Sequence, residues 1–248
     1  MFSAITLTII AASSLTTSFI SGILGMAGGM MLMGILLALL PLRAAMMMHG
    51  ISQLSANGWR ALMLRDEINW RIMRGYVLGL ALALTLFIAL RLVVSKSVAL
   101  IVMGILPFVA LALPERLHLN VERRGHSFVC GLVCNVISLT AGIAGPILDV
   151  FFVRSKMSRH RVVATKAMTQ TLSHLTKVFY FGSVLSLEGV PIGPAIVVML
   201  VTLSFIGTSL SRKVLERMSD ASFRQWSRWT VMALGVAYFV SGVMMLAS

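Results

Sequence analysis

Charged residues are scarce in this chain, and acidic residues are the scarcest. Charged side chains make up 12% of its 248 residues, with 8 Asp and Glu against 21 Lys and Arg, while hydrophobic residues reach 58%. A soluble domain carries about 25% charged residues, so this composition excludes an ordinary soluble domain. Apolar runs of helix length with little alternation also exclude a membrane β-barrel. The chain is therefore predicted to be an all-α polytopic membrane protein.

Motifs of catalysis and nucleotide binding are also missing. The sequence has no HExxH metal motif, no P-loop and no GxSxG nucleophile elbow. Its two cysteines, Cys130 and Cys134, stand four positions apart in one apolar run. This spacing disfavours a disulfide, and two thiols alone make a poor metal site, so we interpret both as packing residues. We predict no catalytic residue, no bound metal and no cofactor, and we do not expect primary active transport from this chain alone.

The basic excess, the methionines and the apolar N-terminus all fit a membrane protein. The formal net charge is +13, but basic residues in short loops set membrane orientation, so we expect no nucleic-acid partner. The 18 methionines are scattered, which favours flexible packing over a copper pathway. No Lys or Arg precedes the N-terminal apolar run, which continues to Leu42. A signal peptide has a basic start and a shorter run, so we interpret this segment as part of the fold.

A glycine-rich segment followed by an apolar helix with polar positions occurs twice, at an offset of 117 residues. Gly25-Met-Ala-Gly28 aligns with Gly142-Ile-Ala-Gly145 without a gap. The same frame aligns further pairs: His49 with Lys166, Ser52-Gln53 with Thr169-Gln170, Asn57 with His174, and Arg60 with Lys177. The polar matches carry the alignment, because glycine and alanine often match by chance in apolar sequence. This pattern is typical of transporters built from two structural repeats.

Each half is predicted to contain a broken-helix hairpin and three full spans. The breaks lie within 1–42 and 126–153, and exposed backbone at membrane depth is tolerated only against protein or a water-filled cavity. The first repeat, 1–114, holds the hairpin 1–42 and the spans 44–64, 72–94 and 97–114. After a cytoplasmic linker, 115–125, the second repeat, 126–248, holds the hairpin 126–153 and the spans 160–182, 189–210 and 227–247. Three crossings in each half make the second repeat inverted relative to the first.

The distribution of basic residues supports this topology. Four loops, 65–74, 115–125, 154–161 and 212–228, hold 15 Lys and Arg, whereas the opposite side holds 3, which are Arg43, Arg91 and Lys96. The positive-inside rule therefore places those four loops in the cytoplasm and both termini in the periplasm. A single crossing at 126–153 would put two basic loops on opposite sides and weaken the asymmetry. Three tryptophans, Trp70, Trp226 and Trp229, fall at predicted membrane interfaces.

The two glycine-rich tips are candidates for an anion site. The helices that restart after Gly28-Gly29 and after Gly145-Pro146 would present free N–H groups and the positive ends of their dipoles. Two such helix starts from opposite sides would form an anion site near the bilayer midplane. The alternative is that these small residues only allow close helix contacts. We favour the site, because two tips at one offset each precede a polar helix.

Two polar stripes follow the tips. Positions i, i+4 and i+8 are polar in both halves: His49, Gln53 and Asn57, then Lys166, Gln170 and His174. Gln53 lies about 15 Å along the helix that begins near Arg43, at about 1.5 Å per residue, which is mid-membrane. A buried, uncompensated Lys166 favours a substrate site. Hydrogen bonding between helices is the alternative for the amides and histidines, most seriously for Asn57.

Three further expectations concern ionisable residues inside the spans. His49 and His174 titrate near neutrality and are candidates for proton coupling. Asp149 is the one acid at membrane depth; it can carry a proton, pair with Lys166 or cap the packing. Arg60 and Lys177 lie within about a turn of the predicted helix ends, so both are expected to extend toward the interface.

The tip Gly25-x-Ala-Gly-Gly, the segments His49-Gly-Ile-Ser-Gln and Asn57-Gly-Trp-Arg60, and their second copies around Gly142 and Lys166 resemble the TauE/SafE sulfite exporter family. The resemblance covers nearly the whole chain. It implies a bacterial inner-membrane carrier that exports sulfite or an organosulfonate such as sulfoacetate, with the tips and stripes lining the substrate site. The chain departs from the commoner Gly-Gly-Gly tip and has His49 and Lys166 where many relatives carry Thr or Ser. A more basic site suits a more highly charged anion.

The sequence thus predicts a secondary transporter that exports a small sulfur-containing anion by alternating access. The predicted substrate-binding residues are Gly25, Ala27, Gly28, Gly29, His49, Gln53, Asn57, Gly142, Ala144, Gly145, Pro146, Lys166, Gln170 and His174. The predicted partners are the anion and the lipid bilayer, and the sequence leaves the oligomeric state open. The alternatives are a carrier of a carboxylate or a metal cation and an uptake permease for a sulfur compound. A membrane-embedded enzyme or a partner subunit is less favoured, because no nucleophile–base or metal constellation is present.

Overall fold

The computed structural model describes residues 2–24, 26–114, 119–184, 192–215 and 220–247. The regular structure in these residues is helical. The first half contains α1 (Ala4–Leu24), α2 (Met26–Leu39), α3 (Leu42–Met63), α4 (Trp70–Leu90) and α5 (Lys96–Ala112). The second half contains α6 (His126–Ala141), α7 (Gly145–Phe152), α8 (Arg159–Phe179), α9 (Pro194–Leu215) and α10 (Asp220–Ala247). Four of them, α1, α4, α9 and α10, are long and apolar enough to cross a membrane, which confirms the prediction of an all-α polytopic membrane protein.

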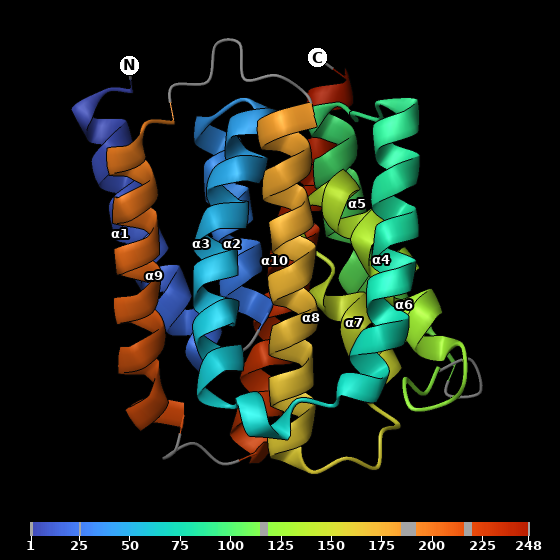
Figure 1. The fold of residues 1–248 in the computed structure, drawn as a ribbon. Helices are drawn as coiled ribbons and strands as arrows, with labels where there is room; N and C mark the ends of the chain where they lie inside the picture. Colours follow the sequence, from blue (N-terminus) through green and yellow to red (C-terminus); the bar gives the residue numbers. More distant parts are fainter. Residues whose placement is uncertain (1, 25, 115–118, 185–191, 216–219, 248) are drawn as a thin grey trace.

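Helices α3 and α8 are as long as the apolar spans but more polar. They contain 22 and 21 residues and carry the two predicted stripes. The two helices pack against each other and against further helices of the bundle (Figure 1). Polar groups at membrane depth are stable only toward protein or water. Their pairing therefore turns the stripes toward the interior.

Local sequence explains where several helices begin and end. Three N-cap side chains accept a hydrogen bond from the first turn of the following helix: Asn69 at α4, Ser95 at α5 and Ser158 at α8. Helix α6 ends at Gly142, whose φ of 80° lies in the left-handed region that favours glycine. Pro146 lies in the first turn of α7, where its missing N–H costs no helical hydrogen bond.

The chain reverses between α1 and α2. A Cβ on Gly28 of α2 would collide with the Thr17 carbonyl and with Ser21 of α1, so the two helices lie side by side. Because α2 begins at Met26, the expectation that the helix restarts after Gly28-Gly29 is wrong. Glycine at position 28 serves the close contact with α1, which is the small-residue packing considered as the alternative.

A second reversal separates α6 and α7. The loop before α6 contacts the end of α7: the Val121 N–H donates to the Phe151 carbonyl at 3.0 Å. The Glu122 carboxylate accepts from the Ser155 hydroxyl at 3.0 Å and from the Lys156 N–H at 2.7 Å. The start of α6 and the end of α7 therefore lie at the same end of the bundle.

Most helix pairs have a counterpart when α1 to α5 of the first half are exchanged with α6 to α10 of the second half, and α2–α3 is an exception. Helix α1 packs along α9, and its counterpart α6 packs along α4. In the same way α2 contacts α10 while α7 contacts α5, and α3 contacts α9 while α8 contacts α4. In the pairs α3–α8 and α5–α10, each helix packs against its own counterpart from the other half. The division of the chain into two inverted repeats stays a prediction.

The two ends of the bundle differ in basic content. The start of α1 and the end of α10 lie at one end, together with the α2–α3 and α4–α5 connections (Figure 1). The α3–α4 and α7–α8 connections lie at the opposite end (Figure 1). The second end carries most of the basic residues of the described loops, while the first carries Arg43, Arg91 and Lys96. Trp70, Trp226 and Trp229 are all exposed.

Candidate functional site

A small cavity lies where both helix breaks meet the two polar helices. From the first half it is lined by Ser21, Met26, Gly29, Met30, His49, Gln53 and Asn57. From the second half it is lined by Ile143, Ala144, Gly145, Gln170 and His174. Its volume is about 30 Å³, and one water needs about 10–15 Å³. The cavity in this conformation therefore has room for about two waters, and an organosulfonate needs it to widen.

The starts of α2 and α7 meet at this cavity. A Cβ on Gly145 would lie 2.6 Å from the Cβ of Met26, so the first residues of the two helices are in direct contact. The first N–H groups of a helix have no partner within it, and they carry the positive end of the dipole. The contact thus directs two positive helix ends at one small volume.

Two side-chain nitrogens at the cavity have no hydrogen-bond partner among the residues that the structure describes. They are Nε2 of Gln53 and Nδ1 of His174, both buried. A buried polar group without a partner costs about 1–3 kcal/mol. Gly29 makes the close approach at this wall feasible, since a Cβ there would lie 3.2 Å from Oε1 of Gln53. The Gln53 amide is therefore available to donate to a ligand or to water, and so is Nδ1 of His174 in the tautomer that carries its proton on that atom.

His49 is engaged at both ring nitrogens. Its Nε2 lies 2.9 Å from the Gly29 carbonyl oxygen, and its Nδ1 lies 2.6 Å from Nζ of Lys177. Lys177 also donates to the Gly142 carbonyl at 2.8 Å. If the ammonium donates to Nδ1, the ring carries its proton on Nε2 and donates to Gly29. One hydrogen-bonded chain thus joins the two glycine-rich breaks.

Asn57 and Arg60 continue the wall of the cavity. Asn57 donates to the backbone carbonyl of Gln53 at 2.9 Å. Arg60 donates to Oδ1 of Asn57 at 3.2 Å and to the Ser21 carbonyl at 3.3 Å. Asn57 therefore hydrogen bonds within its own helix, whereas the alternative interpretation of this residue was hydrogen bonding between helices, and it also accepts from the Arg60 guanidinium next to the cavity wall.

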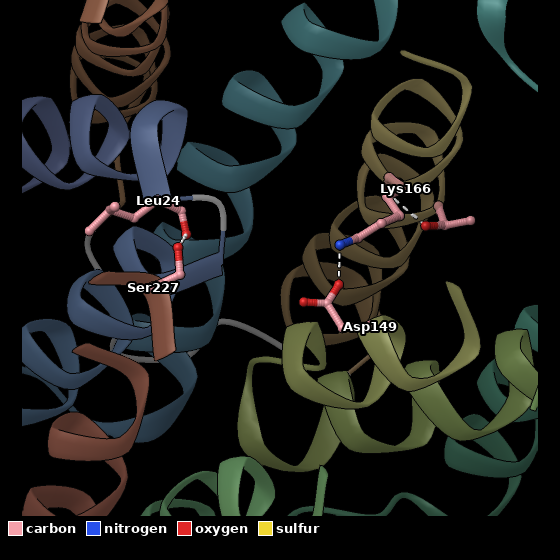
Figure 2. Close-up of polar contacts among 5 residues, drawn as sticks. Leu24, Asp149, Lys166 and Ser227 are labelled. Carbon is pink, nitrogen blue, oxygen red and sulfur yellow. Dashed lines mark hydrogen bonds and ion pairs between the residues drawn. The ribbon is translucent and has the colours of Figure 1, made fainter. Parts of the chain in front are cut away.

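Lys166 does not line the cavity. Its ammonium is paired with the Asp149 carboxylate of α7, as Figure 2 shows, and the side chains of Lys166 and Asp149 are 26% and 42% exposed. Lys166 lies one turn before Gln170, toward the start of α8.

Figure 2 also shows a contact at the end of α1. There the Ser227 hydroxyl of α10 donates to the Leu24 carbonyl, and the two oxygens lie 3.2 Å apart.

The expectation that Lys177 extends toward the interface is wrong. Its side chain is 0% exposed, because the helix does not end soon after it. The turn Tyr180–Val184 continues α8 as a π-helix, so Lys177 lies deeper than its distance from the predicted end of the span implied. Two signals in the sequence pointed to it: Lys177 follows His174 by three residues, on the same helix face, and aligns with Arg60 in the repeat frame.

The remaining predicted residues lie around the cavity without lining it. Ala27 and Gly28 are buried in α2, and Pro146 is buried at the start of α7. Gly142 takes part through its carbonyl, and Gly25 lies outside the described residues. Within the part of the chain that the structure describes, no group of three His, Cys, Asp or Glu could hold a metal. Cys130 and Cys134 are buried with their sulfurs 4.0 Å apart.

Comparison with known proteins identifies one family. The family model described as sulfite exporter TauE/SafE matches residues 10–238. No curated protein and no solved structure matches the chain significantly. The family match extends from within α1 to within α10 and includes every described helix segment that lines the cavity, and it confirms the resemblance drawn from the tips and stripes.

Proposed function

Because this chain belongs to the TauE/SafE sulfite exporter family, we propose that it exports a small sulfur-containing anion by secondary transport. The family implies a membrane transporter of sulfur anions. The substrate we propose is sulfite or an organosulfonate such as sulfoacetate. The observation that carries the proposal is the central cavity, where two helix starts and two unpartnered donors converge without an acidic lining residue.

The proposed site holds the anion between the two helix starts. The free N–H groups at the starts of α2 and α7 face the oxyanion in this proposal, as helix N-termini face anions generally. Nε2 of Gln53 and Nδ1 of His174 supply two further donors. Gln170 lies on the same wall. Hydrogen bonds to a charged group contribute about 1.5–3 kcal/mol each, so a few donors suffice to position a small oxyanion.

The transport mechanism we propose is movement of one inverted repeat against the other. The counterparts among the helix pairs support two related halves. The direct contact between Met26 and Gly145 supports a site shared by both halves. A cavity of about 30 Å³ is too small for an organosulfonate, so the conformation must change before one can enter. His49, His174 and Asp149 are the proposed proton-coupling residues.

Lys166 and Asp149 have a separate role in this proposal. Their pair lies one helical turn from Gln170 toward the basic end of the bundle, and both side chains are partly exposed. An anion that approaches from the basic end can exchange with Asp149 as the partner of Lys166 before it reaches the cavity. The pair is therefore proposed as an entry station on the cytoplasmic side.

Orientation in the inner membrane is a prediction that labelling can check. We expect a membrane-impermeant maleimide to label Ser3→Cys in intact cells and Lys156→Cys only after lysis, in a background with Cys130 and Cys134 replaced by Ala. Ser3, directly before α1, and Lys156, between α7 and α8, are both exposed, and these two segments lie at opposite ends of the bundle (Figure 1). Labelling of Lys156→Cys in intact cells would contradict the cytoplasmic assignment of the basic loops.

The unpartnered donors lead to a second prediction. Gln53→Leu and His174→Leu are each expected to lower the apparent affinity for sulfite by about tenfold or more, because each removes one donor to a charged ligand. The measurement is saturable counterflow of radiolabelled sulfite in proteoliposomes. Gln225→Leu is the matched control, since Gln225 is exposed on α10. Unchanged affinity in both site variants would rule out this assignment of the cavity.

The same counterflow assay tests the function itself. Saturable counterflow, with competition by sulfoacetate and thiosulfate and weak competition by acetate, is the expected result. Folded protein that shows no counterflow with any sulfur anion would contradict the proposal and return the choice to carboxylate or cation carriers. Chemical change of the recovered ligand, detected by mass spectrometry, would indicate an enzyme instead.

A further inference from the structure

Lys177 is a buried lysine whose hydrogen-bond partners are all uncharged groups. It is 0% exposed, and its ammonium donates to the His49 ring and the Gly142 carbonyl. Among the residues that the structure describes, no carboxylate lies within salt-bridge distance of it. A buried charge without an opposite charge is costly, and charged residues inside a membrane usually mark a pathway or a ligand. A bound anion would supply the counter-charge that the described residues do not provide to a protonated Lys177.

Arg60 is in the same situation in the first half. Its partly buried guanidinium donates to the Asn57 amide oxygen and the Ser21 carbonyl, and both of these residues line the cavity. No described carboxylate pairs with it. Neither Lys177 nor Arg60 is among the lining residues, but each forms a hydrogen bond with a residue that lines the cavity.

The two cations occupy matching places. Arg60 donates to a carbonyl in the last turn of α1, and Lys177 donates to the carbonyl of Gly142, which caps the C-terminal end of α6. The last carbonyls of a helix carry the negative end of its dipole, which a nearby cation offsets. The negative helix ends at both breaks are therefore satisfied by protein, and the positive starts of α2 and α7 stay directed at the cavity.

The charge around the cavity does not balance within the described residues. The lining contains no acid, and Asp149, the acid of α7, is paired with Lys166. Resting on the proposed function, we propose that Lys177 and Arg60 together make the site selective for doubly charged sulfur oxyanions over singly charged anions of the same shape. Lys166, whose charge Asp149 offsets, does not set this preference.

Binding of two anions that differ by one charge tests the selectivity. Thiosulfate and methanesulfonate are both tetrahedral about the central sulfur. Thiosulfate carries two negative charges and methanesulfonate carries one. We expect the purified protein in detergent to bind thiosulfate at least about tenfold more tightly than methanesulfonate, because each added charge gains attraction from both cations. Titration calorimetry gives the ratio, and thermal melting shifts give an independent reading.

Substitution of the cations should lower that ratio. Lys177→Met and Arg60→Gln are each expected to reduce the thiosulfate preference by about tenfold, chiefly through weaker thiosulfate binding. The matched controls are Lys96→Met, whose lysine donates to the Leu40 carbonyl away from the cavity, and Arg71→Gln, which is exposed. A structural role alone would weaken both anions equally and leave the ratio unchanged. If Lys177→Met does not fold, Arg60→Gln and the ratio of the unaltered protein still decide.

The outcomes separate this inference from the proposed function. A binding ratio near one in the unaltered protein, or a ratio unchanged in the folded variants, overturns the charge selectivity even if sulfite counterflow is present. A high ratio that falls in the variants, without counterflow of any sulfur anion, supports the selectivity and overturns transport. Counterflow together with the expected ratios supports both.

Discussion

Sulfite counterflow is expected to stop when Ser52→Cys and Ser204→Cys are joined by a disulfide, and to return on reduction. The two native hydroxyl oxygens lie 2.7 Å apart, and both side chains are fully buried between α3 and α9. A disulfide needs its Cβ atoms about 3.5–4.5 Å apart, which two serines in hydrogen-bond contact can approach with small shifts. Because α3 belongs to the first half and α9 to the second, the bond would prevent one half from moving against the other.

The cross-link experiment contains its own controls. Each single cysteine variant differs from serine by one atom, so each alone should transport at close to the normal rate. Cys130 and Cys134 are replaced by Ala to prevent other pairings, and mass spectrometry measures the cross-linked fraction. Normal counterflow in fully cross-linked protein would show that the halves need not move at this contact, which contradicts the proposed mechanism.

Gly145→Ala is expected to reduce counterflow to near background. The added Cβ would lie 2.6 Å from the Cβ of Met26, and a Cβ cannot swing away as a side-chain tip can. The starts of α2 and α7 must therefore separate, which displaces the two positive helix ends from a cavity of only about 30 Å³. Misplacement of binding groups by about 1 Å can cost about a hundredfold in rate.

A compensating change tests the cause of that loss. Met26→Gly removes the opposing Cβ, so the double variant with Gly145→Ala should recover counterflow to within about threefold of Met26→Gly alone. Glycine costs about 1 kcal/mol in a helix interior and less at the first position. The control is Gly193→Ala, because a Cβ there meets no atom within 4 Å. Full activity in Gly145→Ala would refute the close contact of the helix starts.

Much of the fold followed from local patterns in the chain. Apolar runs of helix length dictate spans, because unpaired backbone groups are costly in lipid. The breaks followed from glycine and proline, and the stripes followed from the helical period at His49, Gln53 and Asn57 and at Gln170 and His174. The structure brings these five side chains to one cavity. Periodicity predicts such a face, since it depends only on residues within one helix.

The glycine tips were predicted in position but not in detail. The sequence suggested helix starts after Gly28-Gly29, whereas α2 begins at Met26 and Gly28 packs against α1. Glycine is favoured both where a helix breaks and where helices touch closely. One residue type serves both purposes, so the pattern alone could not separate them.

The sequence by itself determined a polytopic helical protein with two glycine-rich breaks, two polar stripes and a strong basic asymmetry. Tertiary structure decided which buried cation stands behind the cavity. Lys166 met Asp149 on α7, while Lys177 met His49 on α3 and the carbonyl of Gly142. The physical reason is that an intramembrane charge takes its role from its partners. Those partners come from helices that are distant in the chain. The local sequence pattern of one helix does not predict which other helices pack against it.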